Sequence, residues 1–149
     1  MATNETTIEA TPEQVFDVLM DANAYPEWVV GAKEVRAVDP SWPDPGSEFH
    51  HTVGVGPVEI KDSTKMLAHE RPSFVKLEVH AGPVGVGIVE MRITADGEAG
   101  TKVEMVEYPT DGAAETFDGP VEDTAIKARN VEALRRFKNL VEERAAQTA

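Results

Sequence analysis

The sequence predicts an α+β protein in which one antiparallel sheet is followed by a single long C-terminal helix. Apolar residues have helical spacing near the start, a period of two across residues 33–109, and helical spacing again after Pro120. Short connections in the middle part favour an antiparallel meander, in which neighbours in sequence pair with each other. The 149 residues fit one domain, so we expect residues 1–149 to form a single unit.

Charge and composition exclude several classes of protein. The chain has 14 Lys plus Arg against 27 Asp plus Glu, a net charge of −13, and no cysteine. An acidic field repels phosphates, so we expect no nucleic-acid partner. Without cysteine there is no disulfide framework, thiolate nucleophile or Cys-ligated metal, and we expect neither a metal nor a cofactor. The acidic residues fall on the predicted outer faces, where they favour solubility.

The chain carries no evident targeting or membrane signal. Its first residues lack the basic and apolar regions of a secretory signal, and no run of about 18 apolar residues occurs. We therefore expect a cytoplasmic protein without integral membrane association. The sequence leaves its oligomeric state open.

A capping box marks the first helix. Thr11 stands at the N-cap, proline follows at the first helical position, and Gln14 comes three residues after the threonine. Apolar residues then recur at helical spacing, which predicts a helix over 12–20. β-branched residues around Thr7 predict a strand before it, and Asp21 is placed to cap a second short helix carrying Tyr25 and Trp28.

Turn signals divide residues 33–109 into six strands, which with the first strand makes about seven. Alternation assigns one face of each strand to the interior. Two of these strands are expected to form a hairpin around Gly56-Pro57. Their inward residues are Phe49, His51, Val53 and Val55 on the first strand, and Val58, Ile60, Asp62, Thr64 and Met66 on the second.

The last helix begins at Pro120 and is the longest predicted element. We expect about 25 residues, about 38 Å at 1.5 Å per residue, with Arg144 in the last turn and fraying from Ala145 onward. One face carries the residues that should look towards the sheet: Ile126, Asn130, Ala133, Phe137, Leu140 and Val141.

This order of elements is the helix-grip arrangement, in which a curved sheet wraps the last helix and encloses a cavity. Residues 8–19, followed by Tyr25-Pro26-Glu27-Trp28, resemble the opening of the SRPBCC or START-like proteins, and residues 132–142 resemble the end of those chains. This superfamily includes the birch-pollen-allergen-like proteins and the polyketide cyclases and dehydratases. The resemblance implies a helix-grip fold over nearly the whole chain.

The resemblance and the sparse inward polar groups lead to three hypotheses of function. The leading one is non-covalent binding of a small hydrophobic molecule, such as a lipid, polyketide or isoprenoid-like compound, between the sheet and the last helix. The second is an enzyme resembling polyketide cyclases, in which His51 with Asp62 or Asn130 positions and deprotonates a carbon acid. The third is an interaction module whose acidic surface meets a basic partner. Whether the chain catalyses a reaction stays open, as does the identity of its ligand.

His51 is the histidine that alternation places inside. His50 is adjacent on the same strand and must face the other way, so the two cannot ligate one ion. We expect His50, His69 and His80 on solvated faces. An inward imidazole can act as a general acid or base, or hydrogen-bond a ligand hydroxyl or carbonyl; a hydrogen-bonded core histidine is the alternative.

Asp62 is the anomaly among its apolar neighbours, because a buried carboxylate must be paired, protonated or hydrated. A turn centred on Val55-Gly56 places His51 opposite Ile60, within diagonal reach of Asp62. The alternative is a bulge at Gly56-Pro57 that turns Asp62 to solvent.

Asn130 lies in the apolar stripe of the long helix, where its amide can satisfy a polar ligand atom or a trapped water. Trp28 is a packing residue of the helix–sheet junction whose ring edge can also line the cavity. The full set of predicted ligand-binding residues is Trp28, His51, Asp62, Met66, Met105, Asn130 and Phe137, with His51 and Asp62 as the catalytic candidates.

Overall fold

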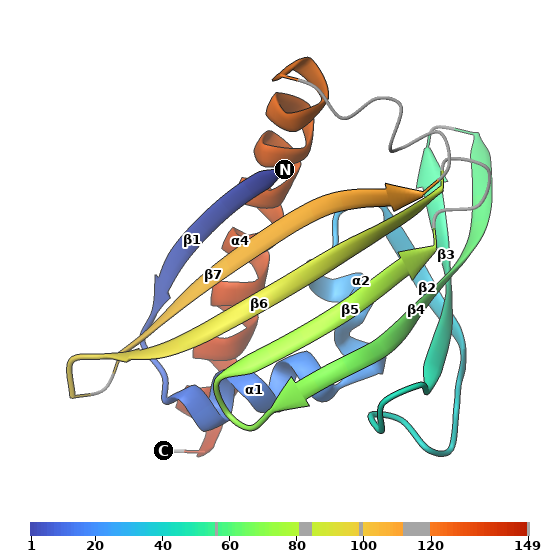
Figure 1. The fold of residues 1–149 in the computed structure, drawn as a ribbon. Helices are drawn as coiled ribbons and strands as arrows, with labels where there is room; N and C mark the ends of the chain where they lie inside the picture. The colour runs from blue at the N-terminus through green and yellow to red at the C-terminus, as the bar shows by residue number, and fades with distance from the viewer. Residues whose placement is uncertain (56, 81–84, 99, 112–119, 149) are drawn as a thin grey trace.

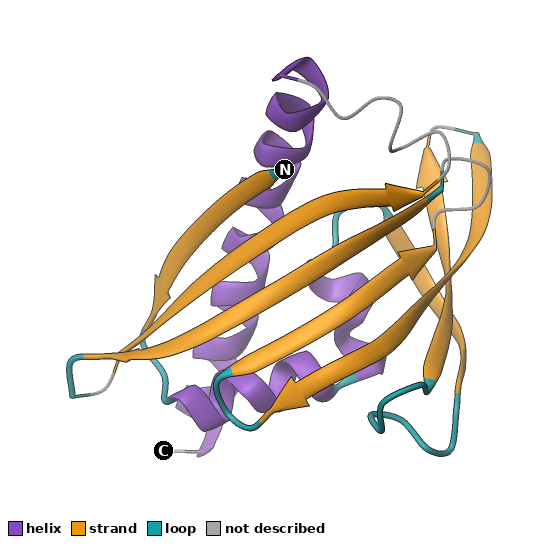
Figure 2. Ribbon diagram, in the orientation of Figure 1, coloured by secondary structure: helices purple, strands orange, loops and turns teal. Residues whose placement is uncertain are grey.

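The computed structural model describes residues 1–55, 57–80, 85–98, 100–111 and 120–148. Its helices lie against one face of a seven-stranded sheet (Figures 1 and 2). In chain order the elements are β1 (Ala2–Ile8), α1 (Pro12–Met20), the 3-10 helix η1 (Ala22–Ala24), α2 (Tyr25–Trp28), β2 (Ala32–Val38), β3 (Glu48–Val55), β4 (Val58–Glu70), β5 (Phe74–His80), β6 (Val86–Asp96), β7 (Gly100–Asp111) and α4 (Pro120–Thr148).

The sheet is the predicted meander. Its strand order is β1-β7-β6-β5-β4-β3-β2, and every neighbouring pair is antiparallel. Only β1 departs from chain order, because it closes the sheet beside β7. We call the side that faces α4 the inner face and the opposite side the outer face; no helix in the described part of the chain covers the outer face (Figure 2).

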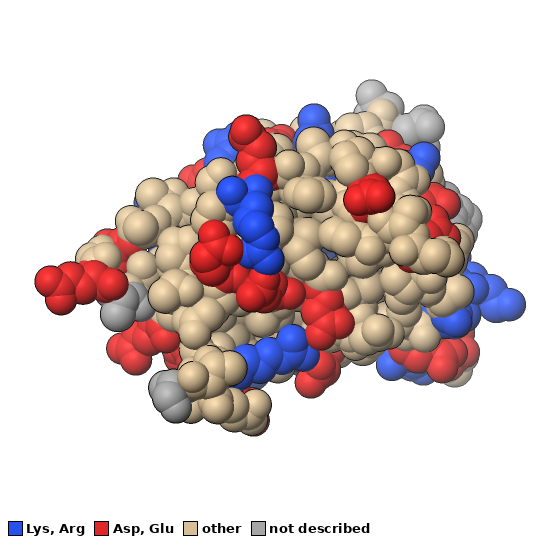
Figure 3. Space-filling model, turned by 90° about the horizontal axis from the view of Figure 1, so that it is seen from below, with Lys and Arg blue, Asp and Glu red and all other residues tan. Residues whose placement is uncertain are grey.

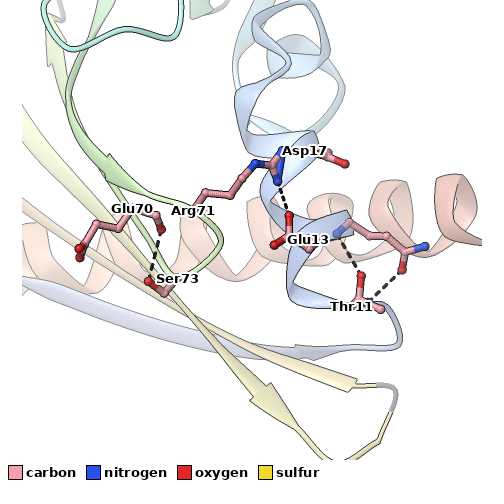
Figure 4. Close-up of polar contacts among 7 residues, drawn as sticks. Thr11, Glu13, Asp17, Glu70, Arg71 and Ser73 are labelled. Atoms are coloured by element: carbon pink, nitrogen blue, oxygen red, sulfur yellow. Dashed lines mark hydrogen bonds and ion pairs between the residues drawn. The ribbon is translucent and has the colours of Figure 1, made fainter.

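The capping box forms as the sequence predicts (Figure 4). The Thr11 hydroxyl accepts from the Gln14 backbone N–H at 3.2 Å, and the Gln14 side chain accepts from the Thr11 N–H at 2.9 Å. Arg71, in the turn after β4, reaches α1 and forms ion pairs with Glu13 and Asp17. These contacts fix the start of α1 against the sheet.

The second short helix is divided in two. Asp21 caps η1 by accepting from the backbone N–H of Asn23 at 3.1 Å, and α2 follows directly. Together η1 and α2 carry Tyr25 and Trp28 to the inner face. The Trp28 ring meets the ring of Phe137 edge-on, with 5.0 Å between centroids.

The core lies between the inner face and the helices as one cluster. Its largest fully buried apolar side chains come from α1, the sheet and α4: Ile8, Val15, Phe16, Met66, Val75, Met91, Val103, Phe137 and Val141. None of the described helices combines the length and apolar character needed to cross a membrane.

Three details differ from the expectations. α4 continues to Thr148 instead of fraying from Ala145, because Ala145 packs against the core and alanine favours helix; Arg144 therefore precedes the last turn. Val58 is 56% exposed, since it stands at the hairpin tip. A register shift between Met66 and Ala68 turns the half-buried His69 ring towards Phe16, at 5.9 Å between centroids.

Candidate functional site

The β3–β4 hairpin positions the two catalytic candidates. His51 lies directly opposite Asp62, and the pairing runs without a shift to Val55 opposite Val58. The turn is thus centred one residue later than expected, and the predicted pairing of His51 with Ile60 is wrong. Proline has no backbone N–H for a ladder, which favours placing Pro57 in the turn.

Both side chains face the interior. His51 is 1% exposed and Asp62 is 7% exposed. The unbroken register excludes the alternative in which a bulge turns Asp62 to solvent. Sequence alternation therefore identified the correct face of both strands.

His51 is held by its strand neighbours and by α2. Its Nε2 is 3.0 Å from the hydroxyl oxygen of Thr64. Its ring lies 4.8 Å from the Tyr25 ring and 5.5 Å from the Phe49 ring, measured between centroids. Burial lowers the pKa of His51 to about 4, with smaller contributions in the same direction from Arg36 and His50. The imidazole is therefore neutral at physiological pH.

Asp62 and His51 face each other but form no hydrogen bond with each other. The buried atoms His51 Nδ1 and Asp62 Oδ1 have no hydrogen-bond partner among the described residues. Burial raises the pKa of Asp62 to about 6, against the lowering effect of Arg36 and His80. The predicted pair is thus brought together but left unsatisfied, which is costly for buried polar atoms.

Tyr25 lies close enough to Asp62 and to Glu107 for both carboxylates to affect its pKa. Burial raises the pKa of Tyr25 to about 12; its hydrogen bond with Thr64 acts against this, while the negative charge of Glu107 adds to it. The phenol is therefore protonated at physiological pH.

Glu107 of β7 forms a hydrogen-bonded cluster with two residues of α4. Both carboxylate oxygens of Glu107 accept from Arg129 Nη2, at 2.8 and 2.7 Å. Asn130, 1% exposed, donates from Nδ2 to Glu107 at 2.9 Å. Asn130 faces the interior as predicted, but its amide N–H is already committed to a protein partner.

The sequence interpretation placed Thr64 on the inward face without counting it as a site residue, and it missed Glu107 and the role of Tyr25. Alternation carried a signal for two of them, because Thr64 lies between Asp62 and Met66 on the inward face and Glu107 continues the inward series of Met105. We call the inward polar set the polar end; it comprises Tyr25, His51, Asp62, Thr64, Glu107 and Asn130.

The remaining candidates lie in the apolar core. Trp28, Met66, Met105 and Phe137 are all at most 6% exposed and belong to one cluster. His50 and His80 are half-buried, and His80 Nε2 lies 2.6 Å from a Glu78 oxygen. Within the described ranges, no three His, Asp or Glu side chains converge to hold a metal ion.

The arrangement combines neutral hydrogen-bonding groups and the Asp62 carboxyl, whose pKa burial raises to about 6, with neighbouring apolar side chains of the core. Such a set can fix the orientation of a mostly apolar molecule through one polar group. It also places a titratable carboxyl where a proton could be exchanged with a bound molecule.

Comparison with known proteins agrees with this architecture. The chain matches the model of the family described as polyketide cyclase / dehydrase and lipid transport over residues 2–142. No curated protein gives a significant sequence match.

Several solved structures share the fold. Ara h 8.0201 is 16% identical with a TM-score of 0.72, over 93% of this chain and 95% of that chain. NE0264 from Nitrosomonas europaea is 13% identical with a TM-score of 0.72, over 95% and 94%. The di-domain ARO/CYC StfQ from the steffimycin biosynthetic pathway is 12% identical with a TM-score of 0.71, over 97% of this chain and 45% of that chain.

The helix-grip fold, with its open antiparallel sheet and long C-terminal helix, is thus common to these proteins. With a family match that spans nearly its whole length, the chain belongs to the polyketide cyclase / dehydrase and lipid transport family of the SRPBCC superfamily.

Proposed function

We propose that the protein binds a small hydrophobic molecule between the inner face and α4, and that the polar end holds a hydroxyl or enol of that molecule. One observation carries the proposal. His51 Nδ1 and Asp62 Oδ1 belong to directly opposite residues, are buried, and have no partner among the described residues. Two neighbouring buried polar atoms without partners are expected where a ligand supplies the missing hydrogen bonds.

A hydroxyl is the group that fits both atoms. The Nδ1 of a neutral histidine either donates or accepts, depending on which nitrogen carries the proton. A hydroxyl oxygen can serve as its partner in either case. When Asp62 is ionised, its carboxylate accepts a charge-assisted hydrogen bond from the hydroxyl. Side chains of directly opposite residues start about 5 Å apart, so one small group can reach both.

The body of the ligand has an apolar lining in this proposal. Trp28, Met66, Met105 and Phe137 extend the inner surface away from the polar end, and methionine side chains adapt to irregular shapes. A lipid, polyketide or isoprenoid-like compound with one terminal hydroxyl matches this division. The family membership supports a hydrophobic ligand of this general kind.

The test uses a pair of probes that differ by one hydroxyl. Binding of 2-naphthol and of naphthalene is measured by calorimetry for the wild type, Asp62→Asn and Asp62→Leu. The wild type should prefer 2-naphthol by about 10-fold or more, since one hydrogen bond to a charged group is worth about 1.5–3 kcal/mol. Asp62→Leu should remove most of this preference, leaving the contribution of His51, and should retain naphthalene binding.

The matched control is Asp96→Asn, which changes an exposed strand carboxylate at the end of β6. It should leave both affinities unchanged. Absence of saturable binding for either probe would contradict the proposed interior site. An unchanged 2-naphthol preference in Asp62→Leu would show that the polar end does not hold the hydroxyl.

A second candidate function is a cyclase or dehydratase reaction. It is favoured by the raised pKa of Asp62, about 6, which leaves a carboxylate at neutral pH that is still basic enough to accept a proton. In this reading Asp62 takes the proton from a carbon next to a carbonyl, and His51 positions that carbonyl. The ARO/CYC function named for StfQ belongs to that protein and supports only the reaction class.

Adjacent histidines provide the test of this candidate. His51→Ala should abolish turnover of a linear poly-β-ketone above the spontaneous background, whereas His50→Ala, on the opposite face of β3, should retain it. Equal turnover in the wild type and His51→Ala would eliminate His51 as a participant. Retained naphthalene binding in the same variant would separate lost chemistry from lost structure, because naphthalene has no hydroxyl for His51 to bind.

A further inference from the structure

A concave region lies on the outer face of the sheet, on the other side of β3 and β4 from the His51 side chain. It is a depression of about 490 Å³ over β2–β6. Alternation separates it from the interior, because His50, Lys61 and Ser63 flank the inward residues His51 and Asp62 along the same two strands. We call it the outer depression; it is lined by Arg36, His50, Lys61, Asp62, Ser63, His80, Gly85 and Val86.

The lining is basic in a protein of net charge −13. Arg36 and Lys61 bring fixed positive charges, His50 brings an imidazole, and Ser63 brings a hydroxyl donor. The buried Asp62 side chain shares the interior side of the sheet with His51. Among the basic residues of the lining, His80 has a carboxylate partner in the described part of the chain, Glu78.

Arg36 is fixed in place by the sheet. Its Nη2 donates to the backbone carbonyls of His51 and Asp62, both at 3.1 Å. A register shift between Val35 and Ala37 leaves Arg36 outside the β2–β3 ladder. The Nε and Nη1 groups have no partner among the described residues. A guanidinium anchored in this way loses little freedom when it binds an anion.

Arg36 and Lys61 differ from most other basic residues of the chain because no carboxylate of the described residues pairs with them. Lys33, Arg92 and Lys102 on the strands each lie within 4.0 Å of a carboxylate, and the arginines of α4 do likewise. Figure 3 shows one face on which Lys and Arg side chains lie against Asp and Glu side chains. Arg36 and Lys61 have no such partner in the described part of the chain.

From these observations we infer that the outer depression binds a small soluble molecule carrying a phosphate or pyrophosphate group. The depression offers hydrogen-bond donors from four side chains: Arg36, His50, Lys61 and Ser63. A carboxylate has only two oxygens to accept from them, whereas a phosphate has three oxygens and up to two negative charges, so a phosphate fits this set of donors better. A long polyanion is disfavoured, because beyond the depression it meets the acidic surface. This site is independent of the interior ligand.

The experiment titrates inorganic pyrophosphate into labelled protein and follows backbone amide shifts. Saturable shifts are expected at residues of the outer depression, below about 10 mM pyrophosphate. Lys61→Glu should weaken binding by about 10-fold or more, the loss expected for a charge-assisted hydrogen bond.

Lys65→Glu is the matched control. Lys65 lies on β4, on the same face, and also has no described carboxylate partner. The rise over four residue steps along the strand places it about 13 Å from Lys61, beyond the Debye length of about 8 Å. It should change the affinity by less than about 2-fold. Equal losses of pyrophosphate affinity in Lys61→Glu and Lys65→Glu would show that only the net charge of the protein matters, and would overturn the site.

A further arm distinguishes a soluble phosphate from a lipid headgroup. The protein is sedimented with phosphatidylcholine vesicles, with and without phosphatidic acid, and should remain in the supernatant in both cases. Sedimentation that requires phosphatidic acid and is lost in Lys61→Glu would overturn the assignment to a soluble molecule. Absence of saturable pyrophosphate shifts would overturn the site, and unchanged 2-naphthol affinity in Lys61→Glu would show that the fold is intact.

Discussion

The interior of this protein has two parts that differ in whether their buried groups are satisfied by neighbouring protein atoms. One is the polar end, where two buried atoms of His51 and Asp62 have no described partner. The other, which we call the apolar end, contains Ile8, Val75, Met91, Val103 and Val141, all at most 1% exposed. Packing satisfies the apolar end, whereas the polar end retains a cost that packing does not remove.

This difference assigns separate tasks to the two parts. Apolar burial at about 25 cal/mol per Å² provides stability that tolerates an unsatisfied site elsewhere. Functional sites commonly contain polar groups that lack hydrogen bonds until a ligand binds, and such groups lower the stability of the ligand-free protein. Substitutions in the two parts should therefore affect the free energy of unfolding with opposite signs.

The largest effect is expected at the apolar end. Met91→Ala removes a fully buried side chain from β6 and should lower the free energy of unfolding by about 2–5 kcal/mol, measured by urea denaturation. Thr94→Ala, on the outer face of the same strand, should cost less than about 1 kcal/mol. A Met91→Ala loss as small as that of the control would remove the distinction between the two parts.

The polar end should respond in the opposite direction. Asp62→Leu replaces an unsatisfied carboxylate and should raise the free energy of unfolding of ligand-free protein by about 1–3 kcal/mol. Thr101→Val is the contrasting variant, because the buried Thr101 hydroxyl donates to the Ala10 carbonyl at 2.6 Å. It should lower stability by about 1–2 kcal/mol. Destabilisation by Asp62→Leu would mean that the carboxylate is satisfied in the folded protein.

The pH dependence of stability separates the contributions of the two candidate residues. The pKa of Asp62 is raised from 3.8 to about 6, so its carboxyl favours the folded state below pH 4 and this advantage is lost as pH rises to 6. The pKa of His51 is lowered from 6.5 to about 4, so its imidazole destabilises the folded state as pH falls through this range. In the wild type the two effects oppose each other between pH 4 and 6.

Single variants should expose each effect. Relative to the wild type, Asp62→Asn should become more stable as pH rises from 4 to 6, and His51→Gln should become less stable. Each difference should change by at most about 1.4 kcal/mol per pH unit. Urea denaturation at several pH values provides the measurement. Differences that do not vary with pH would show that neither group titrates abnormally.

Local patterns in the sequence predicted most of the architecture. The capping box at Thr11, the meander and the start of α4 at Pro120 each depend on residues close together in the chain. The inward faces of β3 and β4 followed from alternation, which identified His51 and Asp62 as buried.

The rest depended on register and on contacts distant in sequence. The β3–β4 pairing was misplaced because the position of a turn is not contained in alternation, and His69 was misassigned because a register shift reverses the faces after Met66. The bond from Asn130 to Glu107 joins residues 23 apart. No local pattern predicts such a contact.

The most direct test of the central claim is a crystal structure of the protein as purified, examined at the polar end. The account predicts density for a non-protein molecule whose polar atom lies within about 3.2 Å of both His51 Nδ1 and Asp62 Oδ1. A structure in which these two atoms bond to each other or to other side chains, with the interior packed shut by protein atoms, would contradict it.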